Sequence, residues 1–261
     1  MSTEVPKQQE LPLTILGLAA SCEVGDVDTT AALVVARAVE SSGGYVCLCN
    51  VHLLTLALHS AEVRRALGGA WKRLPDGAPV AWLQRRVVDG KAQRIGGPDL
   101  MPRVVDLGRG SGLRHFLLGS TPAVGAGVES ALLTRYAGAE IVGRHSPSFG
   151  ENATAEPSTL GAIRAARPDV VWCALGAPKQ ELWMHRCAPS LPDVLFLGVG
   201  AAFDFLADTK QRAPQWMRER GLEWLHRLAT EPARLGSRYF TTNTEFLVRS
   251  GLELTRRRLT S

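Results

Sequence analysis

The chain has 261 residues, 45% of them hydrophobic and 21% charged. This composition excludes a disordered or fibrous protein and supplies enough apolar material for one large core. The formal net charge is +5, but residues 1–211 hold equal numbers of basic and acidic residues. The excess positive charge therefore lies in residues 212–261, which contain ten Arg, five Glu and no Lys or Asp. The C-terminal segment is therefore expected to meet an anion, either a phosphate, an anionic lipid surface or nucleic acid.

The N-terminal residues predict neither a signal peptide nor a transmembrane helix. Residues 1–10 are polar, and the first apolar run, Leu11–Ala20, is too short to span a bilayer. The five cysteines form no Cys-x-x-Cys pair and are expected to be buried, reduced thiols of a cytoplasmic protein.

Strand-like and helical runs alternate along most of the chain. Strands are expected at 13–18, 45–49, 114–119, 139–143, 170–175 and 194–199, and helices at 29–41, 51–67, 77–89, 98–107, 122–137, 158–167 and 179–188. This alternation predicts an α/β, Rossmann-like fold, in which helices cover both faces of an open, mostly parallel sheet. Only helices are expected after Pro214, so we predict an α/β core over residues 1–211 and a basic helical appendage over residues 212–261.

Polar residues follow four expected strand ends. They are Asn50 after 45–49, Asp76 after Arg73–Pro75, Lys179 and Gln180 after 170–175, and Asp204 after 194–199. Because ligands bind at the carboxyl ends of parallel strands, these residues are expected to face one crevice. Pro178 suits a first helical turn, which would place Lys179 and Gln180 at the positive end of a helix dipole, where anions bind.

Seven segments, in this order along the chain, resemble the WecG/TagA/CpsF family of bacterial glycosyltransferases. They span roughly residues 45–240 and comprise Pro75–Val80, Arg94–Leu100, Phe116–Gly119, Gly176–Glu181, Val199–Asp204, Arg212–Pro214 and Gly221–Leu228.

The resemblance implies that a sugar moves, with inversion, from a UDP-sugar to a lipid-linked diphosphate acceptor. UDP-N-acetylmannosamine is the best-known donor and polyprenyl-diphosphate N-acetylglucosamine the acceptor, in surface polysaccharide or teichoic acid assembly. The UDP-sugar is a co-substrate, and no cofactor is implied. The resemblance implies a peripheral protein on the inner, cytoplasmic face of the cell membrane. The chain could also form a homo-oligomer.

The resemblance also implies roles for individual residues. Asp76 takes the proton from the attacking hydroxyl, and Arg94 stabilises the departing diphosphate. Asn50, Gln180 and Asp204 match positions at the nucleotide-sugar pocket. Arg227, Arg234 and Arg238 match arginines that lie over the active site, although the last two are spaced differently here.

Four of the candidate residues also have a simpler interpretation. Pro-Asp-Gly at Asp76 is by itself a turn signature, and Arg94 and Lys179 could be surface cations. Asp204 could instead cap a helix or be a buried structural carboxylate.

Leu48 occupies a position where the family usually has threonine. Because this hydroxyl is lost, one alternative function is that of an enzyme of the same fold that uses another nucleotide sugar and a soluble or specialised-metabolite acceptor. A nucleic-acid-binding module is the alternative from another class, but the chain has no aromatic strand platform or recognition motif to favour it.

Two further motifs are expected to be structural. Asp26-Val27-Asp28 resembles the Asp-x-Asp of metal-dependent glycosyltransferases, but it precedes a helix that Asp28 is expected to cap, so no metal is predicted. Gly108-x-Gly110-x-Gly112 follows a helix, not the strand that a dinucleotide fingerprint requires. The Arg256–Arg258 cluster is expected to attract an anionic membrane.

Overall fold

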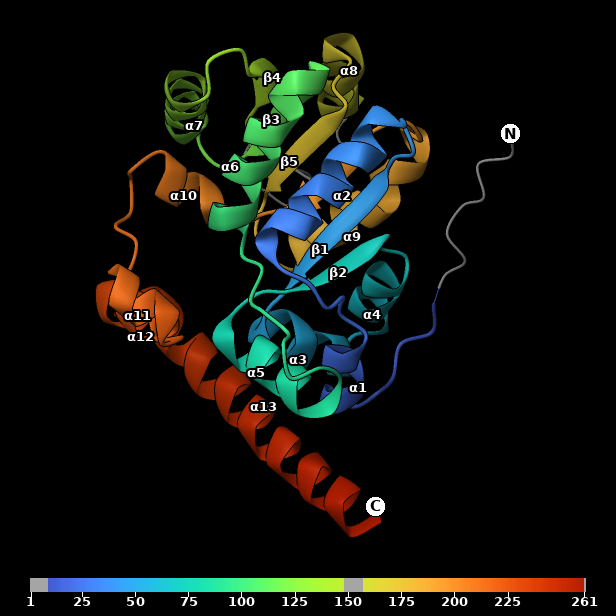
Figure 1. The fold of residues 1–261 in the computed structure, drawn as a ribbon, viewed down its shortest axis with the longest axis vertical. Coiled ribbons are helices and arrows are strands. Elements are labelled where there is room, and N and C mark those ends of the chain that lie inside the picture. Colours follow the sequence, from blue (N-terminus) through green and yellow to red (C-terminus); the bar gives the residue numbers. More distant parts are fainter. Residues whose placement is uncertain (1–8, 148–156, 261) are drawn as a thin grey trace.

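The computed structural model describes residues 9–147 and 157–260. Its strands are β1 (Gly44–Cys49), β2 (Lys72–Pro75), β3 (Arg114–Gly119), β4 (Glu140–His145), β5 (Val170–Ala174) and β6 (Leu195–Gly198). They form one parallel sheet in the order β2-β1-β6-β5-β3-β4 (Figure 1). The predicted α/β fold with an open parallel sheet is confirmed.

Helices pack on both faces of this sheet. The core on one face includes side chains from α1 (Ile15–Ala20), α3 (Val51–His59), α4 (Ala61–Gly68), α5 (Ala78–Val87), α8 (Pro157–Ala166) and α9 (Lys179–Cys187). The core on the other includes side chains from α2 (Val27–Val39), α6 (Gly97–Gly108), α7 (Pro122–Arg135) and α10 (Ala202–Leu206). Short 3₁₀ turns follow α6 (Arg109–Ser111) and α9 (Ala188–Ser190).

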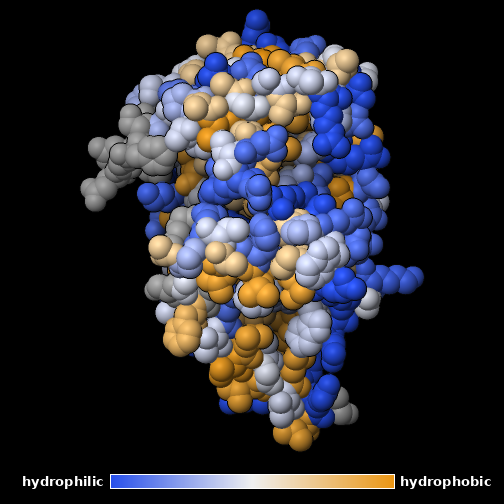
Figure 2. All heavy atoms as spheres, turned by 90° about the vertical axis from the view of Figure 1, so that its left-hand side faces the viewer, coloured by the Kyte–Doolittle hydropathy of each residue, from blue (hydrophilic) through white to orange (hydrophobic). Residues whose placement is uncertain are grey.

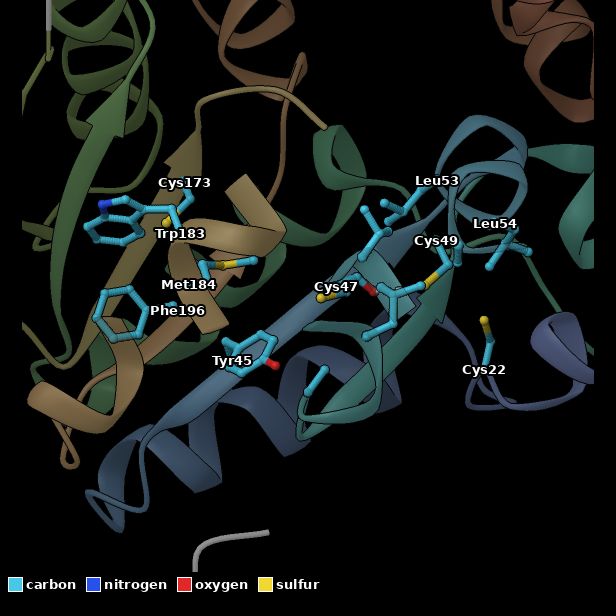
Figure 3. Close-up of a cluster of buried hydrophobic side chains, with 14 of the residues drawn as sticks. Cys22, Tyr45, Cys47, Cys49, Leu53, Leu54, Cys173, Trp183, Met184 and Phe196 are labelled. Atoms are coloured by element: carbon cyan, nitrogen blue, oxygen red, sulfur yellow. Dashed lines mark hydrogen bonds between the residues drawn. The ribbon is translucent and has the colours of Figure 1, made fainter. Parts of the chain in front are cut away.

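The central strands are buried on both faces, and their side chains alternate between the two cores. In β1, Tyr45, Cys47 and Cys49 join the α3/α9 side, whereas Val46 and Leu48 join the α2/α6 side. Figure 3 shows Tyr45 and Cys47 near Met184, with Trp183 and Phe196 beyond. All five cysteines are buried and unpaired, as expected.

The structure corrects two predicted elements. Residues 13–18 do not form a strand, because α1 begins at Ile15. Its N-terminus is held by Thr14, which accepts from Gly17 N at 3.1 Å, and by Glu253, whose carboxylate accepts from Ile15 N at 3.2 Å and Leu16 N at 2.8 Å. The helix expected over 51–67 is broken at Ser60, which is extended and caps α4 through Val63 N at 3.2 Å.

The predicted cap of α2 is also wrong by two residues. Asp26, not Asp28, is the N-cap, and its carboxylate accepts from Thr29 N at 2.8 Å. Asp28 lies in the first turn and pairs with Arg103 at 2.6 Å. Both carboxylates of the Asp-x-Asp motif are therefore committed to protein partners.

The C-terminal segment is helical, with α11 (Gln215–Glu219), α12 (Glu223–Thr230) and α13 (Pro232–Thr260). In Figure 1, α13 runs beneath α3 and α5, and it contacts α1 and α3. Phe246 of α13 is 2% exposed and belongs to the same apolar cluster as Leu53 and Leu54 of α3. The boundary at residue 211 stays a prediction, but α13 shares the core of the preceding residues. Among the described residues, no helix combines the length and apolar character that membrane crossing requires.

Phe246→Ala is expected to lower the free energy of unfolding by about 3–5 kcal/mol, because it empties a packed core site. Urea denaturation would measure the change. Phe240→Ala is the matched control, since Phe240 lies on the same helix but is 77% exposed, and a change within about 0.5 kcal/mol is expected there. Equal stability of the two variants would contradict a core role for α13.

Candidate active site

A cavity of about 680 Å³ lies at the carboxyl ends of β2, β1, β6 and β5. The loops after these strands form one wall, with Asn50, Asp76, Gln180 and Gly200. The C-terminal helices form the opposite wall, with Arg218, Trp224, Arg227, Phe240 and Phe246. The predicted crevice is thus present, and three of the four expected strand ends contribute predicted residues to it.

Asp76 is held at the end of β2 by backbone hydrogen bonds. Its N–H donates to Cys49 O, at the end of β1, at 2.9 Å. The preceding carbonyl, Pro75 O, accepts from Ile95 N at 2.8 Å. Gly77 follows with a φ of +93°, a conformation that favours glycine, and α5 then begins. The Pro-Asp-Gly turn therefore presents the carboxylate to the cavity.

The charges around Asp76 suit a proton acceptor. Burial raises the pKa of its carboxyl, the nearby Arg94 and Arg227 act to lower the pKa, and Glu223 acts to raise it. The net result is a pKa above the ordinary value for aspartate. A carboxylate that is more basic than usual, in a cavity, has the properties of a general base.

Asn50 and Leu48 line the cavity at the end of β1. Asn50 caps α3, and its Oδ1 accepts from Leu53 N at 3.1 Å. Leu48 is 5% exposed and presents only a hydrocarbon surface at the position where the resemblance predicts a hydroxyl.

Gln180 is buried, and its side chain connects the loop after β5 to Glu181 of α9. Its Oε1 accepts from Gly176 N at 3.2 Å, and its Nε2 donates to Glu181 Oε1 at 2.8 Å. Gly198 leaves the space for this amide, because a Cβ there would lie 2.8 Å from Gln180 Nε2. Pro178 precedes α9 as its N-cap, so α9 begins at Lys179 and not at the proline.

Lys179 and Asp204 are not part of the described cavity wall. Lys179 is exposed at the start of α9. Asp204 pairs with Lys210 at 3.0 Å, and Lys210 also pairs with Glu231 at 3.2 Å. Substrate contacts by these two residues stay predictions.

Of the three predicted C-terminal arginines, the structure places one in the cavity wall. Arg227 lines the cavity, and its guanidinium lies 5.8 Å from the centroid of the Phe205 ring. Arg234 and Arg238 lie within α13, but their side chains are outside the described residues.

Arg94, Asp99, Arg212 and Glu223 form a ring of ion pairs beside the cavity, here called the ion-pair ring. Asp99 Oδ2 accepts from Arg94 Nη2 at 2.8 Å and from Arg212 Nη2 at 2.6 Å. Glu223 accepts from Arg94 Nη1 at 2.6 Å and lies 3.9 Å from Arg212 Nε. The ring joins α6 to α12, and therefore the core to the opposite cavity wall.

Three members of the ion-pair ring were not predicted from the sequence. Asp99, Arg212 and Glu223 all lie inside segments that carry the family resemblance, and this was the available signal. Burial acts to raise the pKa of Asp99, but the hydrogen bond from Arg212 and the charges of Arg212 and Arg94 outweigh it and lower the pKa.

The described residues contain no cluster of three or more His, Cys, Asp or Glu side chains that could hold a metal ion. The cavity wall itself offers carboxylate, amide and guanidinium groups, which can accept a proton, form hydrogen bonds and bind anions.

Comparison with known families agrees with this geometry. A family model described as "Glycosyl transferase WecG/TagA/CpsF family" matches residues 14–260, nearly the whole chain.

Glu181 generates a testable pH dependence. Its side chain is fully buried, and burial raises its pKa to about 7, so the folded state retains a proton that the unfolded state releases near pH 4.5. Stability from this proton is complete below about pH 4.5 and is lost as the pH rises through about 7. Relative to Glu181→Gln, the wild type should therefore lose on the order of 2–3 kcal/mol of unfolding free energy between pH 5 and pH 8. Urea denaturation at both pH values would measure it. An unchanged difference between the two proteins would contradict the raised pKa.

Proposed function

The chain belongs to the WecG/TagA/CpsF family of glycosyl transferases, and we propose that it transfers a sugar, with inversion, from a UDP-sugar to a polyprenyl-diphosphate-linked sugar. Family membership makes it a glycosyltransferase of cell-surface polysaccharide or teichoic acid biosynthesis. N-acetylmannosamine is the proposed sugar, and the UDP-sugar serves as co-substrate without a further cofactor.

The position of Asp76 carries this proposal. Asp76 lines the cavity with Arg94 and Arg227, whose charges act on its carboxylate, and burial raises its pKa. Asp76 accepts the proton of the acceptor hydroxyl as the oxygen bonds to the anomeric carbon. The bond from that carbon to the UDP oxygen breaks on the opposite side, and its electron pair leaves with UDP, which inverts the configuration.

The departing diphosphate requires positive charge. Arg227 lines the cavity and is placed to supply this charge as it develops. Arg94 is also in the wall, but both of its Nη atoms donate to carboxylates. Arg94 therefore contributes through its charge and by holding Glu223 in position.

The outer surface of α13 supports a peripheral membrane location. Phe240, Leu247, Val248, Leu252 and Leu259 are exposed on α13, and Phe240 and Leu247 also line the cavity. Figure 2 shows hydrophobic surface beside hydrophilic surface over the lower part of the molecule, where α13 lies. We propose that this surface rests on the anionic cytoplasmic leaflet, where a lipid-linked acceptor presents its diphosphate.

Leu48 favours a second candidate. Its side chain removes a hydroxyl from the cavity wall, so an enzyme of the same fold with another nucleotide sugar and a soluble acceptor is the alternative. A panel of UDP-sugars, each tested with lipid-linked and soluble acceptors, would separate the two.

Asp76→Asn is expected to lower kcat by about 10²- to 10⁴-fold while UDP affinity changes little, because the amide keeps the shape but cannot accept the proton. A transfer assay and calorimetric titration with UDP would measure the two effects. Asp193→Asn is the matched control, because Asp193 is exposed in the loop before β6, away from the cavity. Wild-type turnover by Asp76→Asn would remove Asp76 from the mechanism.

The combined replacement of Arg256, Arg257 and Arg258 by Gln is expected to weaken binding to anionic vesicles by about 10²-fold, at about 1 kcal/mol for each cation. Co-sedimentation at two salt concentrations would measure it, and wild-type binding should fall as salt rises because exposed charges are screened over about 8 Å. Replacing Arg135, Arg164 and Arg186, exposed on α7, α8 and α9, makes the same charge change elsewhere. Equal losses in both triple variants, or salt-insensitive binding to neutral vesicles, would contradict the α13 surface as the contact.

A further inference from the structure

We propose that Arg218, on α11, binds a substrate diphosphate directly in the cavity. The proposal rests on the function proposed above and adds a residue that no motif of the sequence indicated. The ligand chemistry is a diphosphate, which both the UDP-sugar and the lipid-linked acceptor carry.

The first observation is an unpaired buried donor. Arg218 lines the cavity, and its Nε is buried without a hydrogen-bond partner among the described residues. Buried N–H groups nearly always have a partner in folded proteins, so a buried guanidinium N–H without one, on a residue that lines a cavity, indicates a missing acceptor. Arg227 shows the same feature, because its Nε is also buried and unpartnered on the same cavity wall.

The second observation is how charge is distributed among the cations at the site. Arg94 and Arg212 form ion pairs with carboxylates in the ion-pair ring, and Lys210 pairs with two further carboxylates. Arg218 and Arg227 are two cations of the cavity wall for which the structure gives no ion pair with a described residue.

The position of Arg218 relative to the ion-pair ring explains why a carboxylate of the protein does not satisfy it. Arg218 is near enough to Asp99 for its charge to help lower the pKa of that carboxyl. However, Asp99 Oδ2 already accepts from both Arg94 and Arg212. Arg218 therefore lies near the ring and lines the cavity without an ion pair to a described carboxylate.

A diphosphate fits this pair of arginines better than a single carboxylate does. Guanidinium groups bind phosphate oxygens through paired N–H groups, and two adjacent phosphates offer acceptors to two separate arginines. Arg218 and Arg227 come from different helices, α11 and α12, so one ligand that spans both would hold this wall of the cavity in place.

Arg218→Gln tests the proposal, with Arg220→Gln as the matched control. Arg220 lies two residues further along, is exposed, and has its guanidinium 5.8 Å from the ring centroid of Trp216. Calorimetric titration would compare UDP, uridine and inorganic pyrophosphate, with a thermal melt of each variant. We expect Arg218→Gln to weaken UDP and pyrophosphate binding about 10- to 100-fold, the loss typical of a charged hydrogen bond, and to leave uridine binding and the melting temperature unchanged. Arg220→Gln should change none of these.

The two diphosphate sources give different results. If UDP affinity is unchanged and KM for the lipid-linked acceptor rises by the same factor, the ligand is the acceptor's diphosphate. The proposal is overturned if Arg218→Gln changes neither quantity, or if uridine binding weakens as much as UDP binding. Pyrophosphate separates this proposal from the proposed function: a wild-type chain that binds pyrophosphate through Arg218 but not UDP would contradict only the choice of donor.

Discussion

The ion-pair ring of Arg94, Asp99, Arg212 and Glu223 connects the two walls of the cavity. Two arginines and two carboxylates balance one another in partly buried positions. Loss of one member of a buried pair leaves its partner with an uncompensated charge, which costs about 3–5 kcal/mol. The geometry of the C-terminal wall, and with it the positions of Arg218 and Arg227, therefore depends on a balance of charge that begins in α6 of the core.

The order of the strands explains why residues distant in the chain meet at this site. β2, β1, β6 and β5 are neighbours in the sheet, so residues near positions 50, 76, 180 and 200 lie along one edge. Each strand stops at a turn or a helix start that exposes polar groups, as at Gly77 and Gly176, which both have positive φ. Asp76 gains its basicity from this placement, because burial among apolar strand ends acts against the two nearby arginines.

The fold could be predicted where local pattern and tertiary packing agree. The runs at 45–49, 114–119 and 170–175 are buried on both faces and became strands. The run at 13–18 begins a helix, which Thr14 caps locally and which Glu253, more than 200 residues away, also holds by accepting from its first N–H groups. The contact with Glu253 is one that no local pattern contains. The site divides in the same way. Turn and strand-end signals predicted the place of Asn50, Asp76 and Gln180 in the cavity wall. Asp204 instead pairs with Lys210, six residues away, and Arg218 lines the cavity because the C-terminal helices pack against the core, which no strand-end signal indicates.

The burial of Phe246 makes the C-terminal segment a poor unit for exchange between related enzymes. α13 fills the core through Phe246, caps α1 through Glu253, lines the cavity through Phe240 and carries the exposed apolar surface. A chimaera joined near residue 211 would have to match the surfaces of α1 and α3 and the charge of Asp99 at the same time. Divergence of the C-terminal segment is therefore expected to proceed through single substitutions that covary across these contacts, and not through recombination of whole segments.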